Sequence, residues 1–372
     1  MTHFAVIGRG LIGSAAARHL AIAGHQVTLI GPPEPADKVN HAGVFGSHYD
    51  EGRITRALDP DLYWSNVSAA SIARYKDIEA QTGVSFFTEC GAMIAGPQNS
   101  EYIQSVKRIQ KDQGIVCDRF FGSVLVEAFP YFKFPDDFQA LYEPKAAGYI
   151  SPRNLVQAQT VAATNAGAKL VDAIALGLSE TKPGIIITTD KDEINADQVL
   201  VAAGGFTNMI LPQPLPLIAY ARTVAYFELN EDEAMRLSDM PSLVLSFADG
   251  CAPYILPPIL YPNGKTYIKI GGDQVDEMLE TVDDIKAWFK SGGSAEVGKY
   301  LRSMLLDIIP NLRYETMHTE ACMTTFTADE RPIISRQSDR ITVAVAGCGR
   351  GAKCSDELGR RAAEQATAFD TV

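Results

Sequence analysis

The chain has 372 residues, of which 46% are hydrophobic and 21% charged, and its formal net charge is −12. This length exceeds what a single hydrophobic core organises, so we expect two domains of a globular protein. The negative charge argues against a nucleic-acid or anionic-membrane partner. No stretch approaches the roughly 20 apolar residues of a membrane span, and no basic segment precedes the first apolar run, so we expect a cytoplasmic location.

The six cysteines form no CxxC pair and have no histidine at metal-ligand spacing. This dispersion predicts neither a disulfide framework nor a metal site, and we expect most of them to be reduced, small apolar residues. They are Cys90, Cys117, Cys251, Cys322, Cys348 and Cys354.

The first thirty residues predict a dinucleotide-binding βαβ unit. An apolar strand from Phe4 to Ile7 runs into Gly8-Arg9-Gly10-Leu11-Ile12-Gly13, a small-residue helix and a second strand from His25 to Ile30. Gly8 permits a tight turn, Gly10 permits close approach of a pyrophosphate, and Gly13 lets the helix pack on the strand. The phosphates would bind the helix amides, including those of Leu11 and Ile12.

The usual ribose-binding acid is absent from the end of the second strand, where Gly31 stands. Glu34 follows in the loop. It either reaches the adenosine ribose from there or is a solvated loop charge, in which case backbone groups replace the carboxylate.

The middle of the chain alternates helices with strands. The polar loop 40–56 is too long for a simple connector, which is typical of functional loops. Ser151 and Pro152 predict the start of a helix that runs to about residue 166. We expect the other helices at 61–82 and 100–113, and strands at 84–87, 92–95, 169–171, 184–189 and 198–203. The last strand leads into Gly204, at a position where such sheets admit a cofactor.

Residues 220–272 are β-rich, with the best strands at 223–227 and 266–270. Helices are predicted at 283–291, 295–309 and 355–368, and a strand at 341–346 runs into a glycine-rich segment that contains Gly347, Gly349 and Gly351. This return to βα character predicts interleaved domains. Residues 1–83, 146–215 and 318–372 would bind the dinucleotide, and residues 84–145 and 216–317 would form the substrate domain.

Five segments, taken in their order along the chain, carry a family resemblance: 46–56, 150–155, 268–271, 321–330 and 347–353. Together they resemble the monomeric sarcosine oxidase and N-methyltryptophan oxidase family of FAD-dependent amine oxidases. The resemblance spans most of the chain and implies an α/β Rossmann-like FAD-binding domain interleaved with a β-rich α+β substrate domain, of the glutathione-reductase-2 or D-amino-acid-oxidase type. It also implies that Ser47, His48 and Gly204 contact FAD.

The resemblance assigns chemistry to two residues. Cys322 stands where the family forms a thioether to the 8α-methyl group of the flavin; the alternative is a buried free thiol. Lys269 lies on an apolar strand, where a lysine is costly unless its charge is paired or used. The resemblance places it over the flavin, where a fixed cation would promote electron transfer to O2; otherwise it is a strand-edge lysine that reaches water.

The resemblance matches Arg53 and Lys353 to a pair that binds the substrate carboxylate and contacts the flavin; solvated surface charge is the alternative. The glycine run before Lys353 is one residue shorter than in sarcosine oxidases, which leaves the register of 348–352 open. His48 would lie beside the flavin, and Arg56 would pair with the cofactor or a loop acid.

Tyr254 aligns with an active-site tyrosine, although a packed aromatic is the alternative. Tyr49 and Asp273 replace two histidines of sarcosine oxidase, so they are candidate substrate contacts and argue against sarcosine itself. N-alkyl amino acids, cyclic imino acids and sugar-amine (Amadori) adducts remain as substrates.

The expected activity is oxidation of a secondary amine by FAD, with hydride transfer to flavin N5, hydrolysis of the imine and reduction of O2 to H2O2. The alternatives are a flavin dehydrogenase that passes electrons to a quinone or partner, a flavin subunit of a larger enzyme, and a nicotinamide dehydrogenase. We expect no metal, and a monomer or small homo-oligomer.

Overall fold

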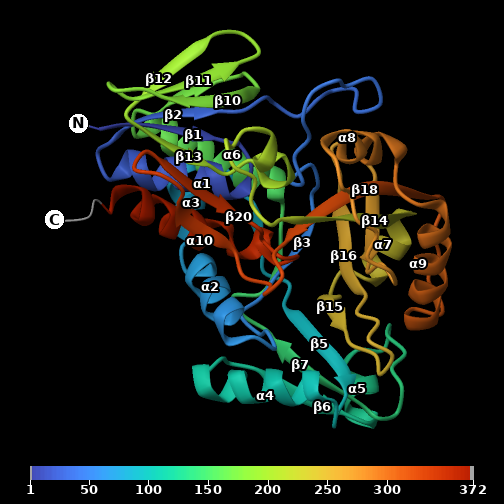
Figure 1. Cartoon of the computed structure of the whole chain (residues 1–372). Helices are drawn as coiled ribbons and strands as arrows, with labels where there is room; N and C mark the ends of the chain where they lie inside the picture. The colour runs from blue at the N-terminus through green and yellow to red at the C-terminus, as the bar shows by residue number, and fades with distance from the viewer. Residues whose placement is uncertain (1, 369–372) are drawn as a thin grey trace.

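The computed structural model describes residues 2–368. Strands from the N-terminal, middle and C-terminal parts of the chain form a six-stranded sheet, which organises one half of the molecule (Figure 1). The order is β19-β20-β13-β1-β2-β9. All neighbours pair in parallel except β19, which is antiparallel to β20. The strands are β1 (His3–Ile7), β2 (Gln26–Ile30), β9 (Lys169–Val171), β13 (Gln198–Val201), β19 (Ile333–Arg336) and β20 (Ile341–Val345).

Helices from both ends of the chain pack together against this sheet. Helix α1 (Leu11–Ile22) contacts both α6 (Pro152–Asn165) and α10 (Gly351–Thr367). The approach of α1 to α10 is close, since a Cβ atom on Gly359 would lie 2.5 Å from that of Ala15. The C-terminal segment therefore completes the domain that the N-terminal segment begins, as the sequence predicts.

An eight-stranded sheet organises the other half of the molecule. Its order is β18-β14-β17-β16-β15-β5-β7-β6, and α7 (Glu231–Arg236), α8 (Val282–Ser291) and α9 (Ala295–Ile308) lie beside it (Figure 1). Phe227, Ile268 and Leu301 belong to its largest buried cluster. The strands are β5 (Ala92–Pro97), β6 (Asp118–Phe121), β7 (Phe138–Glu143), β14 (Ile218–Leu229), β15 (Ser242–Leu245), β16 (Tyr254–Leu260), β17 (Thr266–Gly271) and β18 (Met317–Phe326).

Strand β18 differs from the predicted division at residue 318. It pairs with β14 along its whole length, from Met317 opposite Phe227 to Phe326 opposite Ile218. These hydrogen bonds place residues 317–326 in the second sheet, and the chain returns to the first sheet only after them. Cys322 therefore lies on a strand of the β-rich half.

The remaining elements are two small sheets and several helices. Two three-stranded sheets contain β3 (Arg53–Thr55), β8 (Gly148–Ile150) and β4 (Phe87–Thr88), and β10 (Ala175–Glu180), β11 (Ile185–Thr189) and β12 (Glu193–Ala196). The other helices include α4 (Glu101–Gln113), α5 (Ser123–Ala128) and the 3-10 helix η1 (Gly204–Met209).

Two predicted helices are corrected. The helix expected at 61–82 is two helices, α2 (Leu62–Ile72) and α3 (Tyr75–Thr82), and Arg74 at the break bonds to Asp356 and Glu357 of α10. The last helix begins at Gly351 instead of residue 355, because the chain turns directly from the glycine-rich segment into the helix. Lys353 consequently lies in the first turn of α10.

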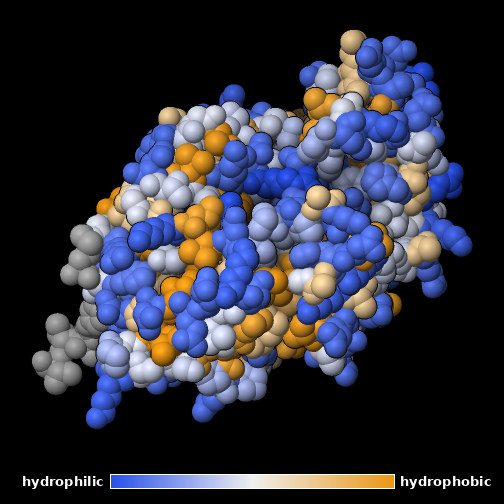
Figure 2. Space-filling view, turned by 90° about the horizontal axis from the view of Figure 1, so that it is seen from above, coloured by the Kyte–Doolittle hydropathy of each residue, from blue (hydrophilic) through white to orange (hydrophobic). Residues whose placement is uncertain are grey.

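Polar residues cover most of the face seen in Figure 2, and hydrophobic residues appear between them in bands. Among residues 2–368, no helix combines the length and the apolar character needed to cross a bilayer. The same residues contain no group of three or more His, Cys, Asp or Glu side chains arranged to hold a metal ion.

Candidate functional site

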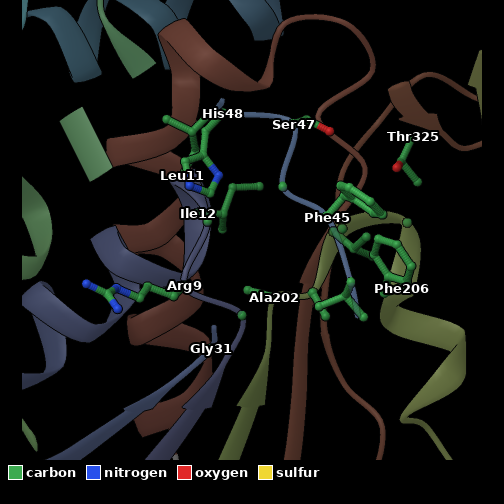
Figure 3. A pocket seen from close by; sticks show the side chains of 18 of the residues that line it. Arg9, Leu11, Ile12, Gly31, Phe45, Ser47, His48, Ala202, Phe206 and Thr325 are labelled. Atoms are coloured by element: carbon green, nitrogen blue, oxygen red, sulfur yellow. The ribbon is translucent and has the colours of Figure 1, made fainter. Parts of the chain in front are cut away.

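A cavity of about 260 Å³ lies at the carboxyl ends of β1, β13 and β20 and extends to β18 (Figure 3). Most of the predicted cofactor contacts line it. In Figure 3, His48 lies beside Leu11, while Phe45 and Phe206 lie together on another side. The predicted residues in its wall are Gly8, Gly10, Leu11, Ile12, Ser47, His48, Tyr49, Arg53, Gly204, Cys322, Gly347, Gly349 and Gly351.

Gly8 and Gly13 make the close backbone contacts that their spacing predicts, and Gly10 has open space where a pyrophosphate is expected. Gly8 has a φ of +109°, and a Cβ atom there would lie 2.3 Å from the carbonyl oxygen of Ala202. A Cβ atom on Gly13 would lie 1.8 Å from the carbonyl oxygen of Gly8, so Gly13 is needed for packing and does not line the cavity. A Cβ atom on Gly10 would have open space around it, with its nearest neighbour 3.9 Å away.

Two helix N-termini meet at the cavity. Gly10 caps α1 and Arg350 caps α10, and neither helix has a side-chain hydrogen bond at its cap. Both leave N–H groups free at the positive end of a helix dipole. This arrangement suits an anionic dinucleotide.

One residue of the cavity wall has an unpaired hydroxyl. Thr324 on β18 lines the cavity, and its Oγ1 is buried without a hydrogen-bond partner among the described residues. A buried hydroxyl without a partner is costly, so a polar group or water bound near this strand would stabilise it. Together with the open space at Gly10, Gly204 and Gly351, these features fit the predicted FAD.

Glu34 does not line the cavity. Its carboxylate accepts two hydrogen bonds from Arg153, at 2.6 and 2.8 Å, and Arg153 also bonds to Glu51 at 2.6 Å. The ribose contact predicted for Glu34 is therefore not supported by this geometry. An acid could not replace Gly31 either, because a Cβ atom there would lie 2.6 Å from that of Arg9.

A buried charge cluster lies at the other end of the cavity, beside Cys322. Lys269 is completely buried on β17, and its Nζ bonds to the carboxylate of Asp50 and, at 2.7 Å, to the carbonyl oxygen of Gly52. Arg53 contacts the same carboxylate. Its Nη2 also lies 3.4 Å from the Sγ atom of Cys322, so the cluster reaches the cavity wall through Arg53.

Burial shifts the titration of several groups here. It lowers the pKa of His48 to about 4, so that imidazole is neutral, and raises that of Tyr49 to about 12. Burial, followed by the nearby Arg53 cation, lowers the pKa of Lys269 well below its ordinary value. The ion pair with Asp50 opposes this effect and favours the charged lysine.

Lys353 lies in a second, separate charge cluster and does not line the cavity. Its Nζ bonds to Asp59 at 2.9 Å, while Arg56 and Arg350 approach the same carboxylate at 3.8 and 3.5 Å. The structure therefore does not bring Arg53 and Lys353 together, because the early start of α10 directs Lys353 toward Asp59. The predicted pairing of Arg56 with a loop acid is confirmed.

Tyr254 and Asp273 also stand outside the cavity wall. The ring centre of Tyr254 lies 5.9 Å from the Lys269 Nζ, so it packs beside the buried cluster. Asp273 accepts hydrogen bonds from the Thr223 amide at 3.0 and 3.2 Å. Burial raises the pKa of Asp273 to about 6, and its position is that of a support for β14.

Sequence reasoning missed several residues of the site. Phe45, Phe206 and Met323 line the cavity, but single apolar residues carry no functional signal in a sequence. Asp50 was also missed. Two signals in the sequence could have identified it. Asp50 lies in the long loop 40–56, and a buried Lys269 requires an acidic partner.

Comparison with known proteins identifies the family. The model of the family described as FAD dependent oxidoreductase (DAO) matches residues 3–365. The chain is 27% identical over 363 residues to an N-methyl-L-tryptophan oxidase of Yersinia pestis (strain Pestoides F), which covers 96% of this chain and 93% of the relative. This agrees with the family resemblance in the sequence.

Two solved structures share the fold. NikD, an amino acid oxidase essential for nikkomycin biosynthesis, superposes with a TM-score of 0.80 at 18% identity, over 100% of this chain and 96% of NikD. L-proline dehydrogenase from P. horikoshii gives 0.75 at 20% identity, over 98% and 93%. The predicted fold class is thus confirmed, and the chain belongs to the DAO family of FAD-dependent oxidoreductases.

Proposed function

We propose that this protein is an FAD-dependent oxidase of secondary amines, acting on N-alkyl or cyclic amino acids. The observation that carries the proposal is the placement of a buried lysine cluster and Cys322 together at one end of a dinucleotide cavity. The relative that oxidises an N-methylated amino acid supports this substrate class and does not favour the sugar-amine alternative.

Bound FAD would take a hydride equivalent from the C–H next to nitrogen and pass two electrons to O2, which yields H2O2 and an imine that water hydrolyses. The protein would bind the amine, exclude water and fix the charges around the reacting atoms. Tyr49 and His48, both uncharged at neutral pH, would form part of the cavity wall.

Lys269 is the proposed oxygen-activating group. It is a completely buried cation at the cluster that joins the cavity through Arg53, and a fixed cation stabilises negative charge that develops on O2. Its rigid bonds to Asp50 and Gly52 mean that no reorganisation is needed when that charge develops.

Cys322 is the proposed anchor of a covalent flavin. Cys322 lines the cavity, and its Sγ lies 3.4 Å from Nη2 of Arg53. Joining the thiol to the flavin methyl group forms a C–S bond and releases two electrons and two protons, and O2 would accept these to give H2O2.

Arg53 is the proposed partner of the substrate carboxylate, since it lines the cavity. Its guanidinium now contacts Asp50, Gly52 and Ser47, so it would have to exchange or share these bonds. Lys353 would join it only if its bond to Asp59 opened. We further propose a cytoplasmic location, which is supported by the six free cysteines among the described residues.

The test is a peroxide assay with purified protein and a panel of N-methyl amino acids, pipecolate and fructosyl amino acids. Peroxide release with bleaching of the flavin spectrum under anaerobic conditions is the expected result for one of the first two classes. Anaerobic bleaching without peroxide in air, but with fast reduction of an artificial dye, would replace the oxidase by a dehydrogenase. A colourless protein would contradict the proposal.

A further inference from the structure

One carboxylate, that of Asp50, collects the polar groups at the Cys322 end of the cavity. It accepts hydrogen bonds from the hydroxyls of Tyr261 at 2.9 Å and Tyr226 at 3.2 Å. It also bonds to Lys269 and contacts Arg53. The Glu51 amide is a fifth partner, at 2.8 Å, and the Asp50 side chain is 2% exposed. The mechanism above uses Asp50 only to hold Lys269 and does not use its charge.

The Asp50 cluster adjoins the cavity directly. A small second cavity of about 20 Å³ is lined by Asp50 and Tyr226, and its wall shares Tyr49, Arg53 and Cys322 with the main cavity. Charge on Asp50 is therefore separated from the main cavity by no more than the shared side chains. In a buried setting with little water, such charges are poorly screened.

The cluster holds two cations and one acid. Lys269 and Arg53 are positive, and Asp50 is the carboxylate that bonds to both. Removing one member of a buried ion pair leaves an uncompensated charge, which costs far more than a surface charge does. Asp50 is thus positioned to decide both the net charge of the cluster and whether Lys269 keeps its proton.

We propose that Asp50 is a positioning residue that holds Lys269 in place and cancels one of the two positive charges next to the flavin. The inference deepens the proposed function and rests on it. Its consequence is that Asp50 limits how strongly this end of the cavity attracts electrons and anions. Without the Asp50 carboxylate, Lys269 and Arg53 would make the flavin more electron-poor than the intact cluster does.

Other groups near Lys269 do not replace Asp50 as the negative charge that balances Lys269 in the range from pH 6 to 9. Burial raises the pKa values of all three neighbouring tyrosines, Tyr226, Tyr254 and Tyr261, so they stay neutral. The remaining groups are Glu320 and Cys322 on β18, and His318, which stacks on Tyr226. Glu320 is partly exposed and bonds to Lys38 at 3.1 Å, which weakens its influence.

Sulfite affinity of the flavin-loaded protein tests the inference, because sulfite adds to oxidised flavin as an anion and bleaches its visible absorbance. Asp50→Asn retains the shape and raises the local charge by one unit. We expect about tenfold tighter sulfite binding than wild type at pH 6, and a ratio that approaches one by pH 9 as the unpaired Lys269 loses its proton. Because the variant and wild type are compared at the same pH, the ionisation of sulfite affects both affinities equally and does not change their ratio.

A matched control neutralises the adjacent acid. Glu51 bonds to Arg153 and to the Ser151 hydroxyl and has no bond to Lys269, so Glu51→Gln should bind sulfite within about twofold of wild type. Equal sulfite affinity of Asp50→Asn and wild type over the whole pH range would overturn the inference, as would an equal change in both variants.

A second pair of variants keeps the test open if Asp50→Asn does not fold. Lys269→Met should weaken sulfite binding about tenfold, and Asp50→Asn/Lys269→Met should restore it to near the wild-type value at every pH. Equal sulfite affinities of Lys269→Met and the double variant would overturn the inference. None of these measurements needs the amine substrate, so a colourless wild type defeats the proposed function, whereas unchanged affinity in coloured variants defeats only the role of Asp50.

Discussion

The two ends of the cavity are built in different ways. At the βαβ end, backbone atoms do the work: glycines bring strand and helix together, and the amides of α1 face the cavity. At the β18 end, charged and aromatic side chains from distant parts of the chain converge on Asp50. The βαβ end depends on the absence of side-chain atoms at its glycines, and the β18 end depends on the balance of buried charges. Substitutions should therefore damage the two ends in different ways.

The largest effect is expected from Gly13→Ala at the βαβ end. The added methyl group would lie 1.8 Å from the Gly8 carbonyl oxygen, so α1 and β1 must separate. We expect loss of FAD binding by at least about a hundredfold, because the phosphate-binding turn is displaced. The measurement is flavin content per chain after purification.

Gly24→Ala is the control, since a Cβ atom there would meet nothing within 4 Å, although its φ of +88° carries some strain. Full flavin content in Gly13→Ala would contradict this account.

Behind the same end, Asp356 ties α10 to α1 and to Arg74. It bonds to Arg18 at 2.6 Å and to Gln159 at 2.9 Å. Burial opposes ionisation, but the hydrogen bond to His19 and the nearby Arg18 and Arg74 cations lower the pKa of Asp356 below its ordinary range. We expect Asp356→Ala to lower the free energy of unfolding by about 3–5 kcal/mol, because buried cations lose their partner. Urea unfolding measures this loss, and a change below about 1 kcal/mol would contradict it.

Acid should weaken the same ion network. The pKa of Asp356 is lowered in the folded state, and that of the adjacent Glu357 is lowered to about 2. Their stabilisation is therefore complete above the unfolded pKa of about 4 and is lost as the pH falls below it. Unfolding free energies measured from pH 7 to pH 3 should fall mainly below pH 4.5 in wild type and fall less in Asp356→Asn. Parallel curves would contradict the assignment.

At the β18 end, Lys269→Met should slow the reaction of the reduced protein with O2 by about a hundredfold while it leaves folding intact, since a methionine fills the buried space. Stopped-flow reoxidation measures this rate. The matched control is Lys265→Met, because Lys265 is half exposed just before β17 and pairs with Glu228. Equal slowing in both variants would show that Lys269 has no special role.

The smallest effect is expected from Glu34→Gln. This side chain pairs with Arg153 outside the cavity, and both are partly exposed, so the pair should contribute about 1 kcal/mol or less. FAD affinity and unfolding free energy should both change little. A tenfold loss of FAD affinity would instead revive Glu34 as the ribose contact.

The contrast between the two ends also explains what the sequence could predict. The βαβ end is local in sequence, and the roles of Gly8, Gly10 and Gly13 follow from their spacing after a strand. The interleaved fold could be predicted as well, because βα character returns after residue 341. The start of α10 was placed four residues late, since glycines usually mark a turn and here begin a helix.

The β18 end could be predicted only in part. Lys269, Arg53 and Cys322 were identified, but their contacts depend on three segments that meet only in the folded chain. Spacing cannot show that Lys353 pairs with Asp59, because that pairing depends on where α10 begins. Asp50 and Asp59 look alike as loop acids, and only the fold shows that each neutralises a buried lysine.

The most direct test of the central claim is the visible spectrum of purified wild type and Cys322→Ser before and after acid precipitation. Both proteins should be yellow if FAD fills the cavity. We predict that the wild-type pellet keeps its flavin, while Cys322→Ser releases flavin into the supernatant. Colourless wild-type protein, or flavin that stays with the pellet of Cys322→Ser, would contradict the placement of the flavin ring at β18.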